Sequence, residues 1–420
     1  MTAPLASDDR HATATDWRQL VLISFSGFVV WSGFGAILPY LPVFLKEQAH
    51  APVWTIGLIA SMYYAGTFLF ASPLGRLSDR VGRKPVVVAG MLLYSLATLL
   101  FVTTVNAWWF LLFRLCEGIG AASVEPASTA FIADASDEAS RGRAYGLLTS
   151  AQFGGLVAGP ALAIGLNELG GGGRNGFYAI FLAGSAMTLA MAVLLTLFLK
   201  EPPHVALRRK QAVERPTYRS LLTPPILAFL IVAATSHFAM GGWEVIWSIW
   251  LRHLGASMAF VSATWMAFSV PMLFSFAGGL LAERHNRFRL MFGGFAFSAV
   301  AWIVYGFTRN LTLFLAFNVL EGVAVAISMP AKQAFLVQVS PRRWLGTVQG
   351  MEQTSMQLAA WVGTLTAPLL YEWIGGEAIG VGGFVALGGL AVAAPVLRRA
   401  WADIATEGAP GPFEVGRITE

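Results

Sequence analysis

Ionisable side chains that could bind and release protons lie inside long apolar runs of this chain. Arg114 and Glu117 stand three residues apart, and Glu125 follows in the same run. At about 100° per residue of an α-helix, the three fall within an arc of about 80° and can face one cavity. A second run places His237 and Glu244 seven residues apart, again on one helical face. Such groups are costly in hydrocarbon unless they are paired or meet water, so they are candidates for function.

Membrane-spanning helices are the elements that must hold these groups. Of the 420 residues 56% are hydrophobic and 12% are charged, which leaves too little polar surface to cover a soluble globule. A helix needs about 20 residues to cross a bilayer, and twelve segments of this chain reach that length. The predicted spans are residues 19–41, 54–74, 86–104, 107–128, 145–167, 177–199, 224–250, 259–282, 288–306, 311–331, 346–372 and 378–398.

The basic residues predict the orientation of these spans. Lysine and arginine concentrate in the termini and the even-numbered connections. The odd-numbered connections hold only Lys46, Arg174, Arg252 and Arg309. Because short cytoplasmic loops of membrane proteins are enriched in lysine and arginine, both termini are expected in the cytoplasm. We therefore expect a multi-pass protein of the cell inner (plasma) membrane.

The sequence contains a repeat. At an offset of 204 residues Glu117 aligns with Glu321, and Arg114 aligns with Asn318. The same spacing holds across three helices and two loops, which few random alignments would do. Halves related in this way share a pseudo-two-fold axis along the membrane normal, and a binding site is expected between them near mid-membrane.

The predicted fold is therefore an all-α integral membrane protein of twelve transmembrane helices in two pseudo-symmetric six-helix bundles. A stretch rich in basic residues and prolines separates the two bundles. The predicted domains are an N-terminal bundle at 1–199, a cytoplasmic linker at 200–223, a C-terminal bundle at 224–400 and a cytoplasmic tail at 401–420.

Four stretches resemble motifs of the major facilitator superfamily, in particular of its twelve-helix drug/proton antiporters. They are residues 31–42, 75–84, 114–122 and 155–160. The third stretch has Glu117 where the motif usually has glutamine, and the fourth is followed by Ala163 and Ile164 in place of the motif's last two glycines. The resemblance covers essentially residues 17–400 and implies the fold of that superfamily.

The resemblance also implies mechanical roles. The stretch 75–84 is expected to be a short hydrophilic turn that latches the cytoplasmic side closed, with its acid contacting the other half. The expected gate residues are Gly75, Asp79, Arg80, Gly82, Arg83, Asp134 and Arg141. In the fifth helix Gly155 and Gly159 would let another helix approach closely, and Pro160 would permit bending. Packing alone is the alternative explanation for these glycines.

By the same resemblance, helices 1, 4, 7 and 10 line a central cavity. Proton coupling is assigned to Arg114, Glu117, Glu321, His237 and Glu244. Glu321 has no adjacent arginine and is the preferred proton carrier. The alternatives are a purely structural Arg114–Glu117 pair and a hydrogen-bonded core histidine at His237. The substrate cavity is assigned to Trp31, Phe34, Glu117, Trp243, Asn318 and Glu321.

The leading functional hypothesis is proton-coupled efflux of hydrophobic or amphipathic small molecules by alternating access. The incomplete fifth-helix motif keeps a proton-coupled importer of a small nutrient or metabolite open. A lipid or glycolipid exporter is a variant of the first hypothesis, and a non-transporting receptor is the least favoured. No residue pattern indicates an enzyme, a metal site or a cofactor, so a proton gradient is expected to supply the energy. We expect a monomer surrounded by membrane lipid, without a nucleic acid partner.

Overall fold

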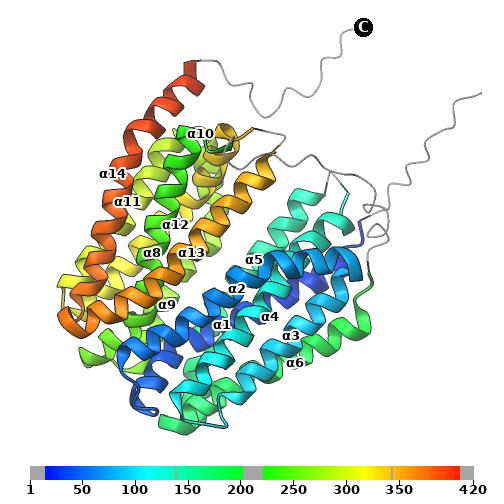
Figure 1. Cartoon of the computed structure of the whole chain (residues 1–420), viewed down its shortest axis with the longest axis vertical. Coiled ribbons are helices and arrows are strands. Elements are labelled where there is room, and N and C mark those ends of the chain that lie inside the picture. The colour runs from blue at the N-terminus through cyan, green and yellow to red at the C-terminus, as the bar shows by residue number, and fades with distance from the viewer. Residues whose placement is uncertain (1–14, 138–139, 202–220, 342–343, 407–420) are drawn as a thin grey trace, which may run out of the picture.

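The computed structural model describes residues 15–137, 140–201, 221–341 and 344–406. Within these ranges the chain is helical and contains no strand. The helices form two groups that lie side by side, one from each half of the sequence (Figure 1). This arrangement is the fold class that the sequence predicts.

The helices follow the predicted order and extend beyond most of the predicted spans. The first group consists of α1 Trp17–Glu47, α2 Val53–Val81, α3 Arg83–Leu100, α4 Ala107–Ala135, α5 Arg141–Leu169 and α6 Gly173–Phe198. The second group consists of α8 Pro224–His253, α9 Met258–Ser269, α10 Ser275–Arg284, α11 Arg287–Phe307, α12 Leu311–Val339, α13 Leu345–Ile374 and α14 Glu377–Thr406.

Helix ends lie close to the two ends of the predicted linker, whereas one helix crosses the predicted border at residue 400. Helix α6 ends at Phe198 and α8 begins at Pro224, on either side of the predicted linker. Helix α14 continues to Thr406 and so includes the first residues of the predicted tail. Most of the linker, at 202–220, and the last residues, at 407–420, lie outside the described residues.

Helix starts are set by capping residues, and the repeat preserves one of them. Asn106 precedes α4, and its side-chain oxygen accepts a hydrogen bond from the backbone N–H of Trp108 at 3.1 Å. Asn310 stands 204 residues later and accepts from the N–H of Thr312 at 2.9 Å, at the start of α12. Each cap satisfies a backbone donor that the first turn of a helix leaves free.

The sequence predicts one continuous helix for the eighth span, residues 259–282, but the structure divides this span into two helices. A 3₁₀ segment, η3 Val270–Phe274, separates α9 from α10. Pro271 lies in this segment. Proline has no N–H to donate, and its ring clashes with the carbonyl one turn earlier, so a regular helix breaks there.

Length and composition alone identify 11 helical segments within the described chain that can cross a membrane, with α9 to α10 counted as one. Helix α13 corresponds to the eleventh predicted span, residues 346–372. It has 30 residues but falls outside that set, and polar residues such as Glu352, Gln353 and Gln357 interrupt its apolar sequence. It packs against α2 and α8 in the middle of the molecule, where polar side chains need not meet lipid.

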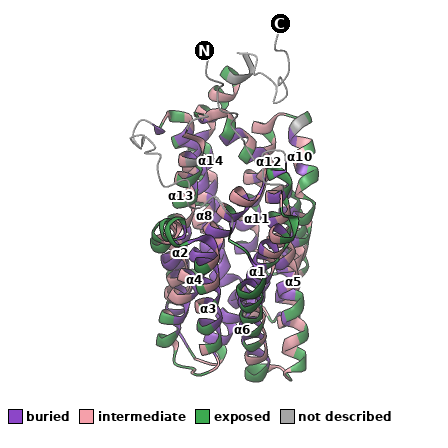
Figure 2. Cartoon of the chain, turned by 90° about the vertical axis from the view of Figure 1, so that its right-hand side faces the viewer, coloured by how far each residue is buried: buried purple, intermediate pink, exposed green. Residues whose placement is uncertain are grey.

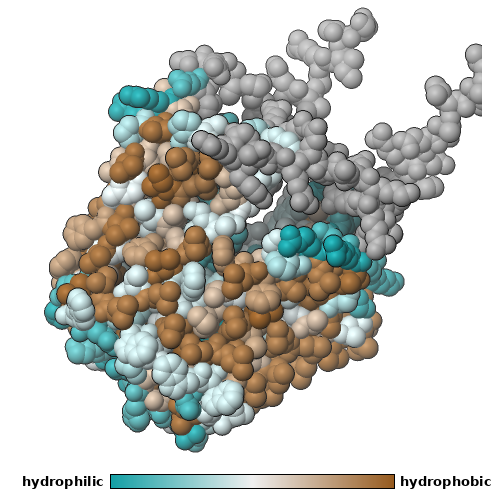
Figure 3. Space-filling model, in the orientation of Figure 1, coloured by the Kyte–Doolittle hydropathy of each residue, from teal (hydrophilic) through white to brown (hydrophobic). Residues whose placement is uncertain are grey.

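Large apolar side chains cover the outside of both groups. Phe198, Phe276 and Val392 are 59%, 68% and 68% exposed. Figure 2 shows buried residues between the helices and exposed residues on their outer faces, and Figure 3 shows hydrophobic residues across the visible face. A surface of this kind suits lipid rather than water. The chain is a multi-pass membrane protein.

Helices α1 and α5 approach each other through the glycines of the fifth-helix motif. A Cβ at Gly155 would lie 2.4 Å from the carbonyl oxygen of Phe28, and one at Gly159 would lie 2.4 Å from that of Ser32. Gly363, the repeat partner of Gly159, meets the Phe238 carbonyl of α8 in the same way. Both halves therefore use close backbone contact at equivalent places.

Gly159→Ala is expected to lower the free energy of unfolding by about 1 to 3 kcal/mol, because rigid backbone atoms surround the new methyl group. Gly165→Ala is the matched control in the same helix, since its Cβ would meet no atom within 4 Å. Alanine there should be neutral or stabilising. Thermal unfolding of the two purified variants measures the difference. Equal midpoints would show that the close approach does not constrain Gly159.

Candidate functional site

A cavity of about 220 Å³ lies between the two groups of helices. The first half contributes residues of α1, α2, α4 and α5 to its wall, and the second half contributes residues of α8, α9 and α13. Its aromatic residues are Trp31, Phe34, Tyr63, Tyr64, Trp265 and Phe268. Its larger polar residues are Glu125, Gln152, His237, Glu244, Gln353 and Gln357. An aromatic wall with a few polar groups is typical of a small-molecule site.

The cavity is closed at the end of the molecule where α1 connects to α2 and α8 connects to α9. Glu47 of α1 and Arg252 of α8 form an ion pair there at 3.0 Å. Trp54 donates its backbone N–H to Glu372 of α13 at 3.3 Å. Toward the opposite end, where α14 finishes, the two groups of helices diverge (Figure 1).

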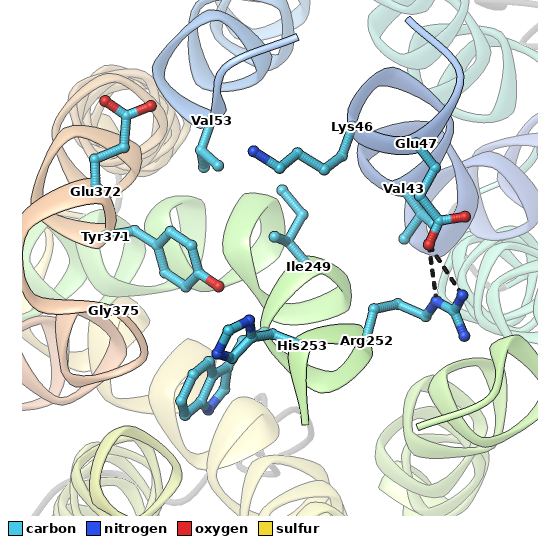
Figure 4. Close-up of a pocket in the computed structure, with 11 residues that line it drawn as sticks. Val43, Lys46, Glu47, Val53, Ile249, Arg252, His253, Tyr371, Glu372 and Gly375 are labelled. Atoms are coloured by element: carbon cyan, nitrogen blue, oxygen red, sulfur yellow. Dashed lines mark hydrogen bonds and ion pairs between the residues drawn. The ribbon is translucent and has the colours of Figure 1, made fainter. Parts of the chain in front are cut away.

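A second pocket of about 570 Å³ lies at the closed end. Figure 4 shows the Glu47–Arg252 pair beside it, with Lys46, His253 and Tyr371 around it. Because residues of both halves line this pocket, separation of the halves at this end must break the pair and reshape the pocket.

Arg252→Gln is expected to favour the form in which this end is open. The ion pair is partly exposed, with side chains 36% and 38% accessible, so its loss is worth about 1 kcal/mol or less, a shift of up to about fivefold in population. Lys46→Gln is the matched control, since it removes the same charge from the same pocket, and no partner of Lys46 occurs among the described side chains. Distances between spin labels on the two halves report the population. If both variants shift the population of the open form equally, the effect comes from the change in net charge and not from loss of the ion pair.

The first half holds a buried ion pair behind the cavity wall. Arg114 Nη1 lies 2.6 Å from Glu117 Oε2, and the hydroxyl of Thr98 donates to Glu117 Oε1 at 2.6 Å. The Arg114 guanidinium also lies over the ring of Tyr63, with 4.6 Å between its central carbon and the ring centre. Glu117 is fully buried. Glu117 faces α3 of its own half rather than the cavity, whereas Arg114 lies against α2.

Glu244 connects the two halves at the cavity. The hydroxyl of Tyr64, on α2, donates to Glu244 Oε2 of α8 at 2.5 Å. Arg114 and Glu244 both line a small void of about 20 Å³, which has room for about one water molecule. The polar groups therefore run from Glu117 through Arg114 and this void to Glu244 and Tyr64 in the cavity wall. Because an arginine side chain stays protonated, this set can couple the charge of Glu117 to Glu244 through the position of Arg114.

The equivalent carboxylate of the second half is buried away from the cavity. The hydroxyl of Tyr305, on α11, donates to Glu321 Oε2 at 2.9 Å. Asn318 donates its side-chain N–H to the carbonyl oxygen of Phe314 at 2.7 Å. Glu321 thus faces α11 as Glu117 faces α3, which extends the repeat from the sequence to the packing.

The expected cavity residues therefore divide into two sets. Trp31 and Phe34 line the cavity, whereas Glu117, Trp243, Asn318 and Glu321 lie behind its wall in this conformation. The reason is helical phase: α4 and α12 turn these carboxylates toward neighbouring helices of their own half. Of the proton-coupling candidates, His237 and Glu244 line the cavity directly.

Several lining residues were not anticipated from the sequence. Tyr63, Tyr64 and Trp265 were not singled out, and neither were the glutamines of α5 and α13. Glu125 was expected on one helical face with Arg114 and Glu117 but was not assigned to the substrate cavity, and it lines that cavity. Polar side chains inside an apolar run are costly next to lipid, so the presence of glutamine in a membrane span could have indicated an inward-facing position.

The stretch 75–84 is mostly helix, which corrects the expected turn. Helix α2 runs to Val81 and α3 begins at Arg83, so only Gly82 separates them, with a φ of 113° that favours glycine. Gly75 lies inside α2. A single residue therefore connects the end of α2 to the start of α3.

Arg83 is the centre of the expected gate. Its guanidinium contacts Asp79 at 2.5 Å and Asp134 of α4 at 3.1 Å. Glu201, just after α6, accepts the backbone N–H groups of Arg83 and Lys84, at 2.5 and 2.8 Å. Within the described chain, the hydrogen bonds and ion pairs found for Asp79 and Arg83 reach the first half and Glu201 of the linker but not the second half. The two halves diverge at this end.

The other expected gate residues take separate positions. Arg141 donates to the carbonyl oxygen of Ser136 at 3.5 Å, close to the start of α5. Arg80 is exposed in the last turn of α2. Arg83 and Arg141 therefore belong to two separate groups of contacts at this end.

Two six-helix halves that enclose a cavity, closed at one end and divergent at the other, define a secondary transporter of the alternating-access class. The family model described as Major Facilitator Superfamily matches residues 23–275 and 238–417. The chain therefore belongs to the Major Facilitator Superfamily, and it is a transporter rather than an enzyme.

Relatives of similar length carry drug-resistance names. The chain is 26% identical over 367 residues to multidrug resistance protein 2 of Bacillus subtilis (strain 168), which covers 82% of this chain and 86% of that protein. It is 28% identical over 384 residues to the class C tetracycline resistance protein of Escherichia coli, with 88% and 94% covered.

Solved structures share the fold at low sequence identity. A D-xylose–proton symporter has a TM-score of 0.73 at 16% identity, with 90% of this chain and 97% of that chain covered. A bacterial homologue of the human lysosomal transporter Spinster, in an inward-facing and unoccupied conformation, has a TM-score of 0.70 at 18% identity, with 93% and 97% covered.

Proposed function

We propose that this protein is a proton-coupled exporter of hydrophobic or amphipathic small molecules. The observation that carries the proposal is the set of polar groups that joins Glu117 and Arg114 to Glu244 at the wall of an aromatic cavity. The drug-resistance names of full-length relatives support export of such compounds.

The coupling step begins at the Arg114–Glu117 pair. A proton that reaches Glu117 neutralises it and releases Arg114, which then turns toward Glu244 across the small void between them. Glu244 is also the acceptor of Tyr64 from the other half. Protonation in the first half thus alters a contact between the halves, which is what coupling to alternating access requires.

In the proposed orientation the divergent end of the cavity faces the cytoplasm and both termini lie there. The excess of lysine and arginine in the connections at that end supports this assignment. The protein then acts as a monomer in the cell inner membrane, surrounded by lipid. It takes up substrate from the cytoplasm and releases it at the end now closed by Glu47 and Arg252.

Export is favoured over import of a small nutrient because of the cavity wall. A sugar-like solute needs a dense set of hydrogen-bonding partners. Here six aromatic residues and several aliphatic ones dominate, with polar groups spaced between them. Such a wall suits a compound with substantial apolar surface.

The test is transport by the purified protein in liposomes that contain a pH-sensitive dye. Lipophilic cations, sugars and organic acids are added in turn after a proton gradient is imposed. We expect lipophilic compounds to dissipate the gradient and sugars to leave it unchanged. A response to sugars alone would establish the importer, and no response to any class would refute coupled transport.

A further inference from the structure

The four buried carboxylates in the membrane-spanning part of the described chain each have a protein partner, whereas the partly buried Glu125 differs from them. Glu117 pairs with Arg114, Glu244 accepts from Tyr64, Glu321 accepts from Tyr305 and Glu352 pairs with Lys332. For the carboxylate of Glu125, no hydrogen bond or ion pair is found anywhere among the described residues. Its backbone carbonyl alone is engaged, by the hydroxyl of Thr129 at 2.9 Å.

Glu125 is not hidden in the protein interior, because it lines the central cavity. It lies on α4 of the first half, next to Pro126. A carboxylate in such a place is costly unless water or a countercharge meets it. No described side chain forms an ion pair with this carboxylate, so the water or countercharge that meets it must come from the cavity.

The surroundings of Glu125 fit an organic cation. Trp31, Phe34 and Tyr64 of the first half and Trp265 and Phe268 of the second half share the cavity with it. Aromatic faces attract cations that have given up their water. A carboxylate within an aromatic cavity therefore recognises a positive charge attached to apolar groups.

We propose that Glu125 is the residue that selects positively charged substrates, and that its carboxylate contacts the cationic group of the bound molecule. This inference rests on the proposed function. It separates two tasks: Glu125 recognises the charge of the substrate, while Glu117, Arg114 and Glu244 handle the proton. The favoured substrates are monovalent organic cations with aromatic or other apolar groups.

Binding to the purified full-length protein in detergent tests this assignment without any transport step. The two probes are tetraphenylphosphonium, a cation, and triphenylphosphine oxide, a neutral compound of related shape. In Glu125→Gln we expect the affinity for tetraphenylphosphonium to fall at least tenfold, while the affinity for the neutral compound changes less than twofold. Glu125→Asp should restore most of the affinity for the cation.

Glu168→Gln is the matched control, because it also neutralises a carboxylate on a helix of the first half but one that is exposed and does not line the cavity. It should leave the affinity for tetraphenylphosphonium unchanged. An equal loss for both probes in Glu125→Gln would assign this residue a structural role and overturn the proposal. So would unchanged affinity for the cation, or a wild-type protein that binds neither probe.

The two proposals can fail separately. A wild-type protein that binds tetraphenylphosphonium through Glu125 but moves no protons in liposomes would refute the proposed function and keep this assignment. A protein that exports lipophilic compounds with coupled proton movement, yet binds both probes equally well in the wild type and in Glu125→Gln, would keep the proposed function and refute this assignment.

Discussion

Glu117→Gln is expected to abolish uphill export, with substrate accumulation in a proton gradient reduced at least tenfold. Glutamine keeps the shape and the hydrogen bond to Thr98 but cannot take up or release a proton. Arg114 then no longer alternates between a paired and an unpaired state. Downhill exchange of substrate should continue, because the cavity wall is unaltered.

Transport in proteoliposomes, with and without an imposed proton gradient, separates these two activities. Glu321→Gln makes the same change at the repeat-related position, where Tyr305 takes the place of a cation. If uphill export fails in Glu321→Gln and persists in Glu117→Gln, the proton carrier lies in the second half, as the sequence predicted. If Glu117→Gln stops downhill exchange as well, its role is structural.

Lys332→Met is expected to lower the free energy of unfolding by about 3 to 5 kcal/mol, because it leaves Glu352 charged and unpaired. The two side chains lie 2.7 Å apart between α12 and α13, and both are 5% exposed. Replacing both residues with methionine should recover most of that loss, since well-packed apolar residues often match a buried ion pair.

Thermal unfolding of the single and double variants in one detergent provides the measurement. A double variant no more stable than Lys332→Met would show that the pair is held by more than mutual attraction. Transport by the double variant then reports on function: continued export would make the pair an element of packing, whereas its loss would make the pair part of the moving machinery.

The repeat explains which parts of the fold could be predicted from the sequence. Glu117 and Glu321 stand 204 residues apart, and so do Asn106 and Asn310. The two members of each pair make equivalent local contacts, one in each half. Apolar length likewise identifies membrane helices, since the bilayer sets the required length. Such features depend on neighbours along the chain.

Two kinds of feature were missed: local breaks and extensions of helices, and the directions in which side chains face other helices. The break at Pro271 and the extension of α2 to Val81 follow from local chemistry that a hydropathy pattern does not capture. The direction in which a helix turns each side chain depends on its neighbours, so the sequence could not tell that Glu321 faces α11 while Glu125 faces the cavity.

The sequence by itself determined the class of this protein: twelve apolar spans, a duplicated half and four motifs of one transporter superfamily. It also identified the ionisable groups, because a charged residue within an apolar segment can be recognised from the sequence alone. Only the tertiary structure decided which of them meet. The Tyr64–Glu244 contact, and a Glu125 carboxylate that lines the cavity without a partner among the described side chains, depend on how the two halves face each other. Local spacing does not encode that relation.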